Sequence, residues 1–116
     1  ATLQLACSLA ALVARNPLND DSLAKVYALL QTAFAAFATA TRSDLVFFKS
    51  LYCFARDEGH PLKQHWFPTL PAADRTLVAD LLNKPVSDQT APPAEIARLR
   101  QRLENYLRGH TEIVLP

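Results

Sequence analysis

Apolar residues recur along the chain at the three- and four-residue spacing typical of α-helices. The first such stretch runs from about Thr2 to Arg15, and the second from about Asn19 to Ala40. The apolar stripe predicted for the first consists of Leu5, Leu9, Leu12 and Val13. The stripe predicted for the second consists of Leu23, Val26, Tyr27, Leu30, Phe34 and Phe37. The short connection 16–19 predicts that the two helices form an antiparallel hairpin.

A third stretch, residues 43–58, is apolar over most of its circumference, which is typical of a helix surrounded by protein. Ser43 is a suitable N-terminal cap, and Gly59 suits the left-handed position after the last turn. The broad apolar arc comprises Phe47, Phe48, Leu51, Tyr52, Phe54 and Ala55. We therefore predict that this helix is the centre of the fold.

Prolines divide the second half of the chain into shorter pieces. Segment 60–71 contains three prolines, which leave room for a single helical turn at 62–67. Trp66 and Phe67 within it either cover one end of the bundle or present an aromatic anchor to a partner.

Two further helices are predicted after this segment. The fourth runs from Pro71 to Lys84, and the fifth from Pro92 to Arg108 with Gly109 as its C-terminal cap. The fifth has the clearest separation of apolar and charged faces. The tail, 110–116, is predicted to be extended.

These patterns predict an all-α fold, with four to five helices in a compact bundle around helix 43–58. The 116 residues suit one domain, 1–116, with Pro-rich joints at 60–71 and 85–93. A composition of 50% hydrophobic and 20% charged residues is typical of a globular chain rather than a disordered one. No stretch is long and apolar enough for a membrane span. The net charge of +1 gives no general attraction to nucleic acid.

The two cysteines, Cys7 and Cys53, lie on different predicted helices. We expect two small buried hydrophobic side chains rather than a disulfide. Free thiols favour a cytoplasmic location, although the sequence leaves the compartment open.

Candidate chemistry gathers around Cys53. A metal site could draw on the nearby Asp57, Glu58, His60 and His65, but no standard zinc spacing occurs. Lys49 and Arg56 would lower the pKa of an exposed Cys53 thiol, whereas we expect Cys53 to pack inward. No catalytic residue, metal or cofactor is therefore predicted, and a small thiol or metal enzyme centred on Cys53 is the third hypothesis.

The fifth helix carries Arg98, Arg100, Arg102 and Arg108, so a nucleic-acid-binding accessory protein is the second hypothesis. The arginines spread over several faces and alternate with glutamates, which is more typical of a solvated charged surface.

The leading hypothesis is a non-enzymatic protein–protein interaction module, such as an adaptor, accessory, chaperone or regulatory subunit. It follows from the lack of reactive groups at workable spacing. The predicted contact residues are Trp66, Phe67, Arg98 and Arg102, since Trp and Arg are enriched at interface hot spots. A homodimer could also form through the Ala/Thr face of the second helix, which contains Ala28, Thr32, Ala35, Ala36 and Thr39.

Overall fold

The structure is a computed structural model that describes residues 2–16, 20–39, 42–85, 89–113 and 115. Within these ranges every regular element is a helix, which confirms the all-α prediction. The elements are α1 (Thr2–Arg15), α2 (Asp20–Thr39), α3 (Ser43–Asp57), η1 (Leu62–Trp66), η2 (Phe67–Thr69), α4 (Ala72–Asn83) and α5 (Pro93–His110). Residues 17–19 of the predicted connection 16–19 and the side chain of Leu23 lie outside what the structure describes.

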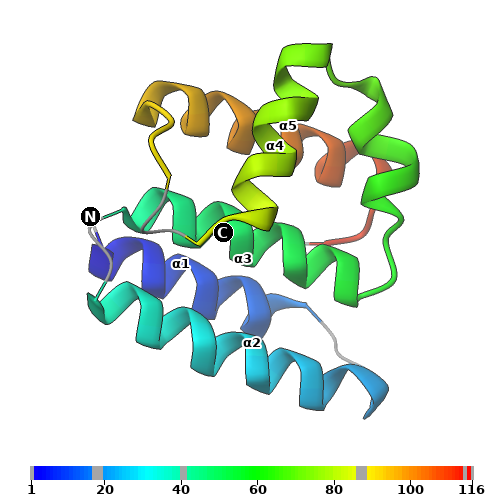
Figure 1. The fold of residues 1–116 in the computed structure, drawn as a ribbon. Coiled ribbons are helices and arrows are strands. Elements are labelled where there is room, and N and C mark those ends of the chain that lie inside the picture. Colours follow the sequence, from blue (N-terminus) through cyan, green and yellow to red (C-terminus); the bar gives the residue numbers. More distant parts are fainter. Residues whose placement is uncertain (1, 17–19, 40–41, 86–88, 114, 116) are drawn as a thin grey trace.

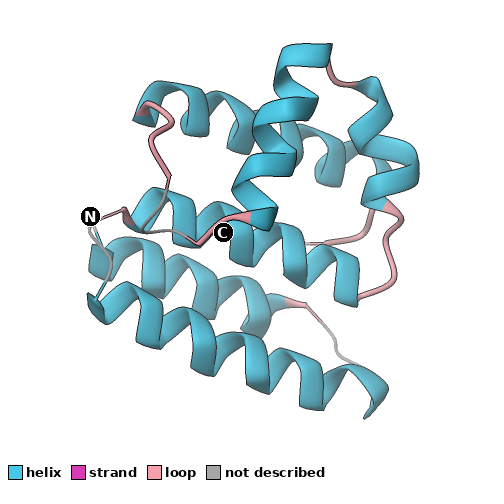
Figure 2. Ribbon diagram, viewed as in Figure 1, coloured by secondary structure: helices cyan, strands magenta, loops and turns pink. Residues whose placement is uncertain are grey.

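Helices α1 and α2 lie side by side and run in opposite directions, and α3 lies along them (Figure 1). Helices α4 and α5 lie on the other side of α3, and the η1–η2 segment joins α3 to α4 (Figure 2). Helix α3 thus contacts α1, α2, α4, α5 and η1. It is the shared centre of the packing, as predicted.

The burial of α3 follows from its sequence. Phe47, Phe48, Leu51 and Phe54 are each 0% exposed, and even Ser50 is buried. A helix covered by neighbours on most sides must be apolar on most sides, because an unpartnered polar group would lose its hydrogen bonds to water. The predicted apolar arc is therefore confirmed.

Helix ends agree with the sequence in part. Gly59 follows α3 with a φ of 92°, the left-handed conformation expected of it. Ser43 is instead the first residue of α3, and the capping position falls on Arg42 without a side-chain cap bond. Gly109 is not a cap either, because α5 continues to His110. Thr111 ends α5 by donating a 2.6 Å hydrogen bond from Oγ1 to the carbonyl of Leu107.

The stripe predicted for α2 is wrong at two positions. Tyr27 is 65% exposed and Phe34 is 42% exposed, whereas Val26, Ala33 and Phe37 are buried. One residue step turns a helix by about 100°, so the buried face is rotated from the predicted one. Ala33 lies in the buried core and lines a pocket together with Val46 and Ser50 of α3, so a small residue takes the buried position that was predicted for Phe34.

No helix in the described ranges is both long and apolar enough to cross a membrane.

Candidate functional site

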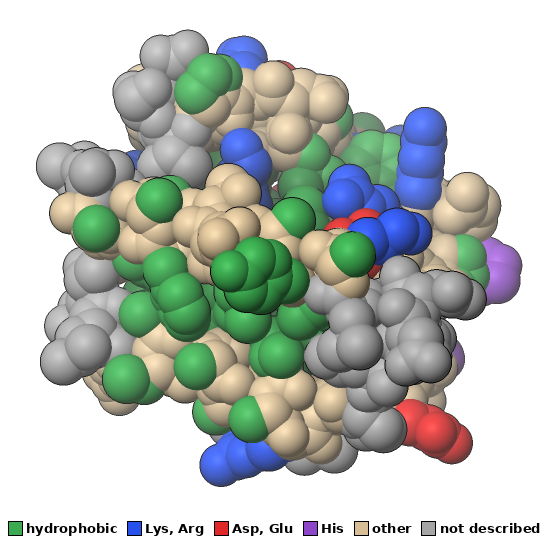
Figure 3. All heavy atoms as spheres, turned by 90° about the horizontal axis from the view of Figure 1, so that it is seen from below, with side chains coloured by type: hydrophobic (Ala, Val, Ile, Leu, Met, Phe, Trp, Pro, Cys, Tyr) green, Lys and Arg blue, Asp and Glu red, His purple; other side chains and the backbone are tan. Residues whose placement is uncertain are grey.

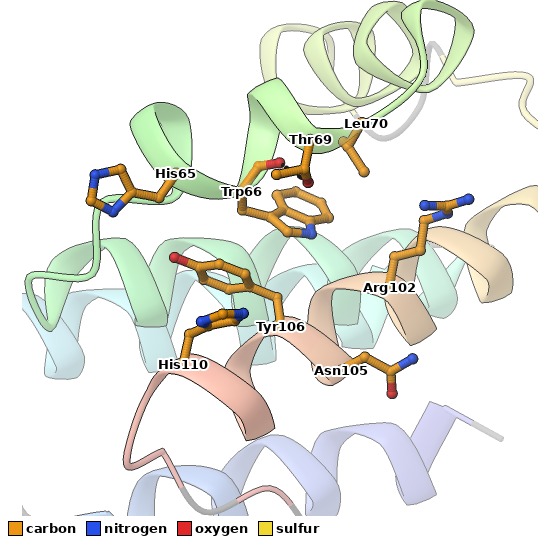
Figure 4. Close-up of a pocket in the computed structure, with 8 residues that line it drawn as sticks. All are labelled: His65, Trp66, Thr69, Leu70, Arg102, Asn105, Tyr106 and His110. Atoms are coloured by element: carbon orange, nitrogen blue, oxygen red, sulfur yellow. Dashed lines mark hydrogen bonds between the residues drawn. The ribbon is translucent and has the colours of Figure 1, made fainter.

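An open pocket of about 520 Å³ lies between the η1–η2 segment and α5 (Figure 4). Its lining combines aromatic, hydroxyl, amide and cationic side chains and contains no Asp or Glu. The lining residues are His65, Trp66, Thr69, Leu70, Arg102, Asn105, Tyr106 and His110. Two of these, Trp66 and Arg102, are contact residues predicted from the sequence.

The η1–η2 segment forms one wall because three of its apolar residues are held in the core. Leu62, Trp66 and Leu70 are 1%, 2% and 4% exposed. Their side chains pack in the core at the start, in the middle and at the end of the segment. The indole of Trp66 lies against the Tyr52 ring, with the centroids 6.3 Å apart. Trp66 therefore belongs to the covering layer of the bundle, and little of its surface is left for an exposed anchor. Phe67 is half-buried against the same core.

Arg98 is bound within the molecule. It donates two hydrogen bonds of 2.7 Å to the carboxylate oxygens of buried Asp74 on α4, and it also pairs with Glu95. These bonds hold the pKa of the Asp74 carboxyl below its ordinary value, and Asp74 raises the pKa of Arg98. The pair fastens α5 to α4. Because the two residues are 24 positions apart, the sequence did not predict this ion pair.

Arg102 contacts the same carboxylate more loosely, with its Nε 3.6 Å from Oδ2 of Asp74. Its side chain is 47% exposed, and it extends into the pocket (Figure 4). Of the two predicted arginines, Arg98 therefore has a structural role, whereas Arg102 lines the pocket.

The other wall comes from the last turns of α5. Tyr106 and His110 are four residues apart, and their rings stack with centroids 4.7 Å apart. The helix end predicted at Arg108 lies before His110, so the sequence did not reveal this pair. The i, i+4 spacing of two rings was the signal that could have revealed it.

The arginines of α5 do not form a free basic surface in the described part of the chain. Besides Arg98 and Arg102, Arg100 places its guanidinium carbon 4.2 Å from the centroid of the Phe47 ring. Its Nε lies 3.4 Å from Oε1 of Glu104, an ion pair without hydrogen-bond geometry. A nucleic-acid interface would need these cations for phosphates, so this arrangement does not favour the second hypothesis.

Cys7 and Cys53 are both free thiols. Cys7 is exposed, which corrects the expectation that both are buried, and Cys53 is half-buried. Burial raises the pKa of the Cys53 thiol, although Arg56 and Lys49 act in the opposite direction. A thiol with a raised pKa is a poor nucleophile at neutral pH. Over the described residues no group of three His, Cys, Asp or Glu could hold a metal ion.

We expect a thiol reagent to modify native Cys7 about tenfold faster than Cys53, because Cys7 is exposed, whereas Cys53 is half-buried and burial raises its pKa. Absorbance of the released thiolate, compared between the wild type and Cys7→Ser, measures both rates. In denaturant without reductant both residues should react. Fast modification of native Cys7→Ser would show that Cys53 is accessible and contradict this expectation.

A second surface stands out on the opposite side of α3, on the outer face of α1 and α2. Charged residues are scarce there, since residues 2–14 and 26–39 contain no Asp, Glu, Lys or Arg. Figure 3 shows hydrophobic side chains gathered over the middle of this face. The large hydrophobic residues that the structure shows exposed, Tyr27 and Phe34, both belong to α2.

Comparisons with protein-family models, with curated proteins and with solved structures find no match to this chain. Function is therefore argued from these surfaces alone.

Proposed function

We propose that the chain is a non-enzymatic protein–protein interaction module that binds an α-helix of its partner along the outer face of α2. One observation carries the proposal. Five of the exposed positions of α2 follow one another at alternating intervals of three and four residues, the spacing by which one helix packs along another. These positions, the α2 seam, are Ala24, Tyr27, Gln31, Phe34 and Ala38.

The α2 seam suits an apolar helix. Tyr27 and Phe34 lie two turns apart and offer large aromatic contacts, while the alanines above and below them allow close approach. Solvent-exposed helices of globular proteins normally turn charged residues outward, and here the exposed face is uncharged from Val26 to Thr39. An uncharged surface is complementary to an uncharged partner.

Gln31 interrupts the apolar seam at its centre. It donates a 3.2 Å hydrogen bond from Nε2 to the Tyr27 hydroxyl. A single polar residue within a helix–helix seam fixes register at some cost in stability. We therefore infer that the partner helix places a polar side chain opposite Gln31.

The contact surface proposed here, the α2 seam, differs from the one predicted from the sequence. Trp66 and Arg98, chosen from the sequence, are engaged within the molecule, whereas Tyr27 and Phe34 were assigned to the core. The role of the predicted contact residues in partner binding stays a prediction. Self-association would use the same α2 seam in both copies.

Photo-crosslinking tests the proposal. A benzophenone amino acid replacing Phe34 should capture a protein in the source cells, and the same group replacing exposed Gln64 on η1 should not. The captured protein, once purified, should bind Phe34→Glu at least about tenfold more weakly than the wild type, because interface hot spots cost 2 kcal/mol or more. Gln64→Glu, which adds the same charge elsewhere, should bind normally.

Other results of these experiments would identify self-association or contradict the proposed contact. If the captured protein is a second copy of the chain, sedimentation should show a dimer that Phe34→Glu dissociates. A circular dichroism melt must confirm that Phe34→Glu is folded. Undiminished binding by the folded variant, or equal capture from position 64, would contradict a contact through the α2 seam.

A further inference from the structure

The pocket of Figure 4 has a chemistry that the proposed interaction with α2 does not use. It is lined by the η1–η2 segment and α5. These elements lie on the other side of α3 from α2 (Figure 1).

Arg102 is the cation that extends into the pocket. The carboxylate of Asp74 is occupied by Arg98, which binds both of its oxygens at 2.7 Å. Arg102 approaches the same carboxylate with its Nε 3.6 Å from Oδ2, a longer contact. Among the described residues Asp74 is the acidic residue that forms an ion pair with Arg102, and neither Asp74 nor Glu95 lines the pocket. A guanidinium presented in this way can bind a carboxylate through two parallel hydrogen bonds.

Trp66 adds a second donor. Its side chain is largely covered, but the edge of the ring that carries the indole nitrogen is turned towards Arg102 (Figure 4). The indole N–H can only donate a hydrogen bond. The guanidinium and the indole N–H therefore face one region from two walls of the pocket.

The rest of the pocket is suited to an apolar or flat group. The Tyr106 ring, which stacks on His110, provides an aromatic surface, and Leu70 lies across from Arg102. Aromatic rings bind other rings in offset or edge-to-face arrangements. The donors lie beside this surface, so a bound molecule would carry its charge at one end.

We propose that this pocket binds an organic carboxylate, with the carboxylate between Arg102 and the Trp66 indole N–H and an aromatic or apolar body against Tyr106. A single available guanidinium with one neutral donor matches a group with one negative charge and two oxygens. The same chemistry occurs in a small aromatic acid and at the C-terminus of a peptide that ends in an aromatic residue.

The sequence contains one tryptophan, so the indole N–H gives a single reporter signal in a ¹H–¹⁵N nuclear magnetic resonance spectrum. Benzoate serves as a probe for the small acid, and N-acetylphenylalanine as a probe for the peptide terminus. We expect at least one to shift the indole signal saturably, and its neutral amide to bind at least about tenfold more weakly, because the charge-assisted bonds are lost. The tighter of the two acids identifies the source of the ligand.

Matched arginine variants separate the pocket from general charge effects. Arg102→Gln should lose the saturable shift, and Arg108→Gln, an exposed arginine at the end of the same helix, should keep it. Arg102→Lys retains the charge but not the two-pronged geometry, so it should weaken binding and also serves if Arg102→Gln fails to fold. Phe34→Glu should bind the acid normally, whatever becomes of the α2 seam.

Three results would each overturn the proposal. The indole signal could fail to shift with either acid, or the amides could bind as well as the acids. Folded Arg102→Gln and Arg102→Lys could also both bind like the wild type.

Discussion

Replacing Phe48 with alanine is expected to lower the free energy of unfolding by about 3–5 kcal/mol, and replacing Leu51 by about 2–5 kcal/mol. Both side chains are 0% exposed and belong to α3, which contacts α1, α2, α4, α5 and η1. Removing either leaves a cavity that the surrounding helices cannot all close. Urea denaturation followed by circular dichroism measures the loss.

Lys63→Ala is the matched control, because Lys63 is exposed on η1 and surface substitutions typically change stability by no more than about 0.5 kcal/mol. Coincident unfolding curves for all three variants would show that α3 is peripheral and that the arrangement described here is wrong. A loss confined to one of the two core variants would indicate that the site of the other can collapse around the cavity.

The sequence alone predicted the features that depend on local interactions. The prolines and the apolar repeats located the helices to within a few residues, and the breadth of the apolar arc identified residues 43–58 as central. Gly59 was predicted for the same reason, since a left-handed residue after a helix favours glycine. Each of these signals lies within a few residues of the feature that it predicts.

The features missed depend on contacts between distant residues. Which face of α2 is buried depends on its packing against α1 and α3, and no repeat within α2 distinguishes the face bearing Ala33 from the one bearing Phe34. The binding of Asp74 by Arg98 joins two helices and could not be inferred from either one. The candidate surfaces therefore became visible only after the helices were packed together.

The α2 seam and the pocket differ in which elements of the fold form them. The α2 seam is an outward row of uncharged residues on a single helix, and its exposure is what requires explanation. The pocket draws its side chains from η1, η2 and α5, and its geometry is held by buried Trp66 and by the ion pairs around Asp74. A change that loosens the η1–η2 segment should disturb the pocket without altering the α2 seam.

Trp66→Ala should therefore have two effects, the first on stability. The indole is 2% exposed and packs beside Tyr52, so its removal is expected to cost about 3–5 kcal/mol. Trp66→Phe keeps a ring in the same space and should cost less. Circular dichroism in urea measures both variants, because the intrinsic tryptophan signal is lost with the residue.

The second effect distinguishes the covering role of Trp66 from the anchor role considered from the sequence. If Trp66→Ala is destabilised by this amount but binds the protein partner normally at low temperature, where it remains folded, the indole is a structural residue. If its unfolding curve matches the wild type and partner binding is lost, Trp66 is an anchor and the η1–η2 segment must open on binding. The burial of Leu62 and Leu70 on either side of Trp66 favours the first outcome, because opening the segment would expose all three side chains to water.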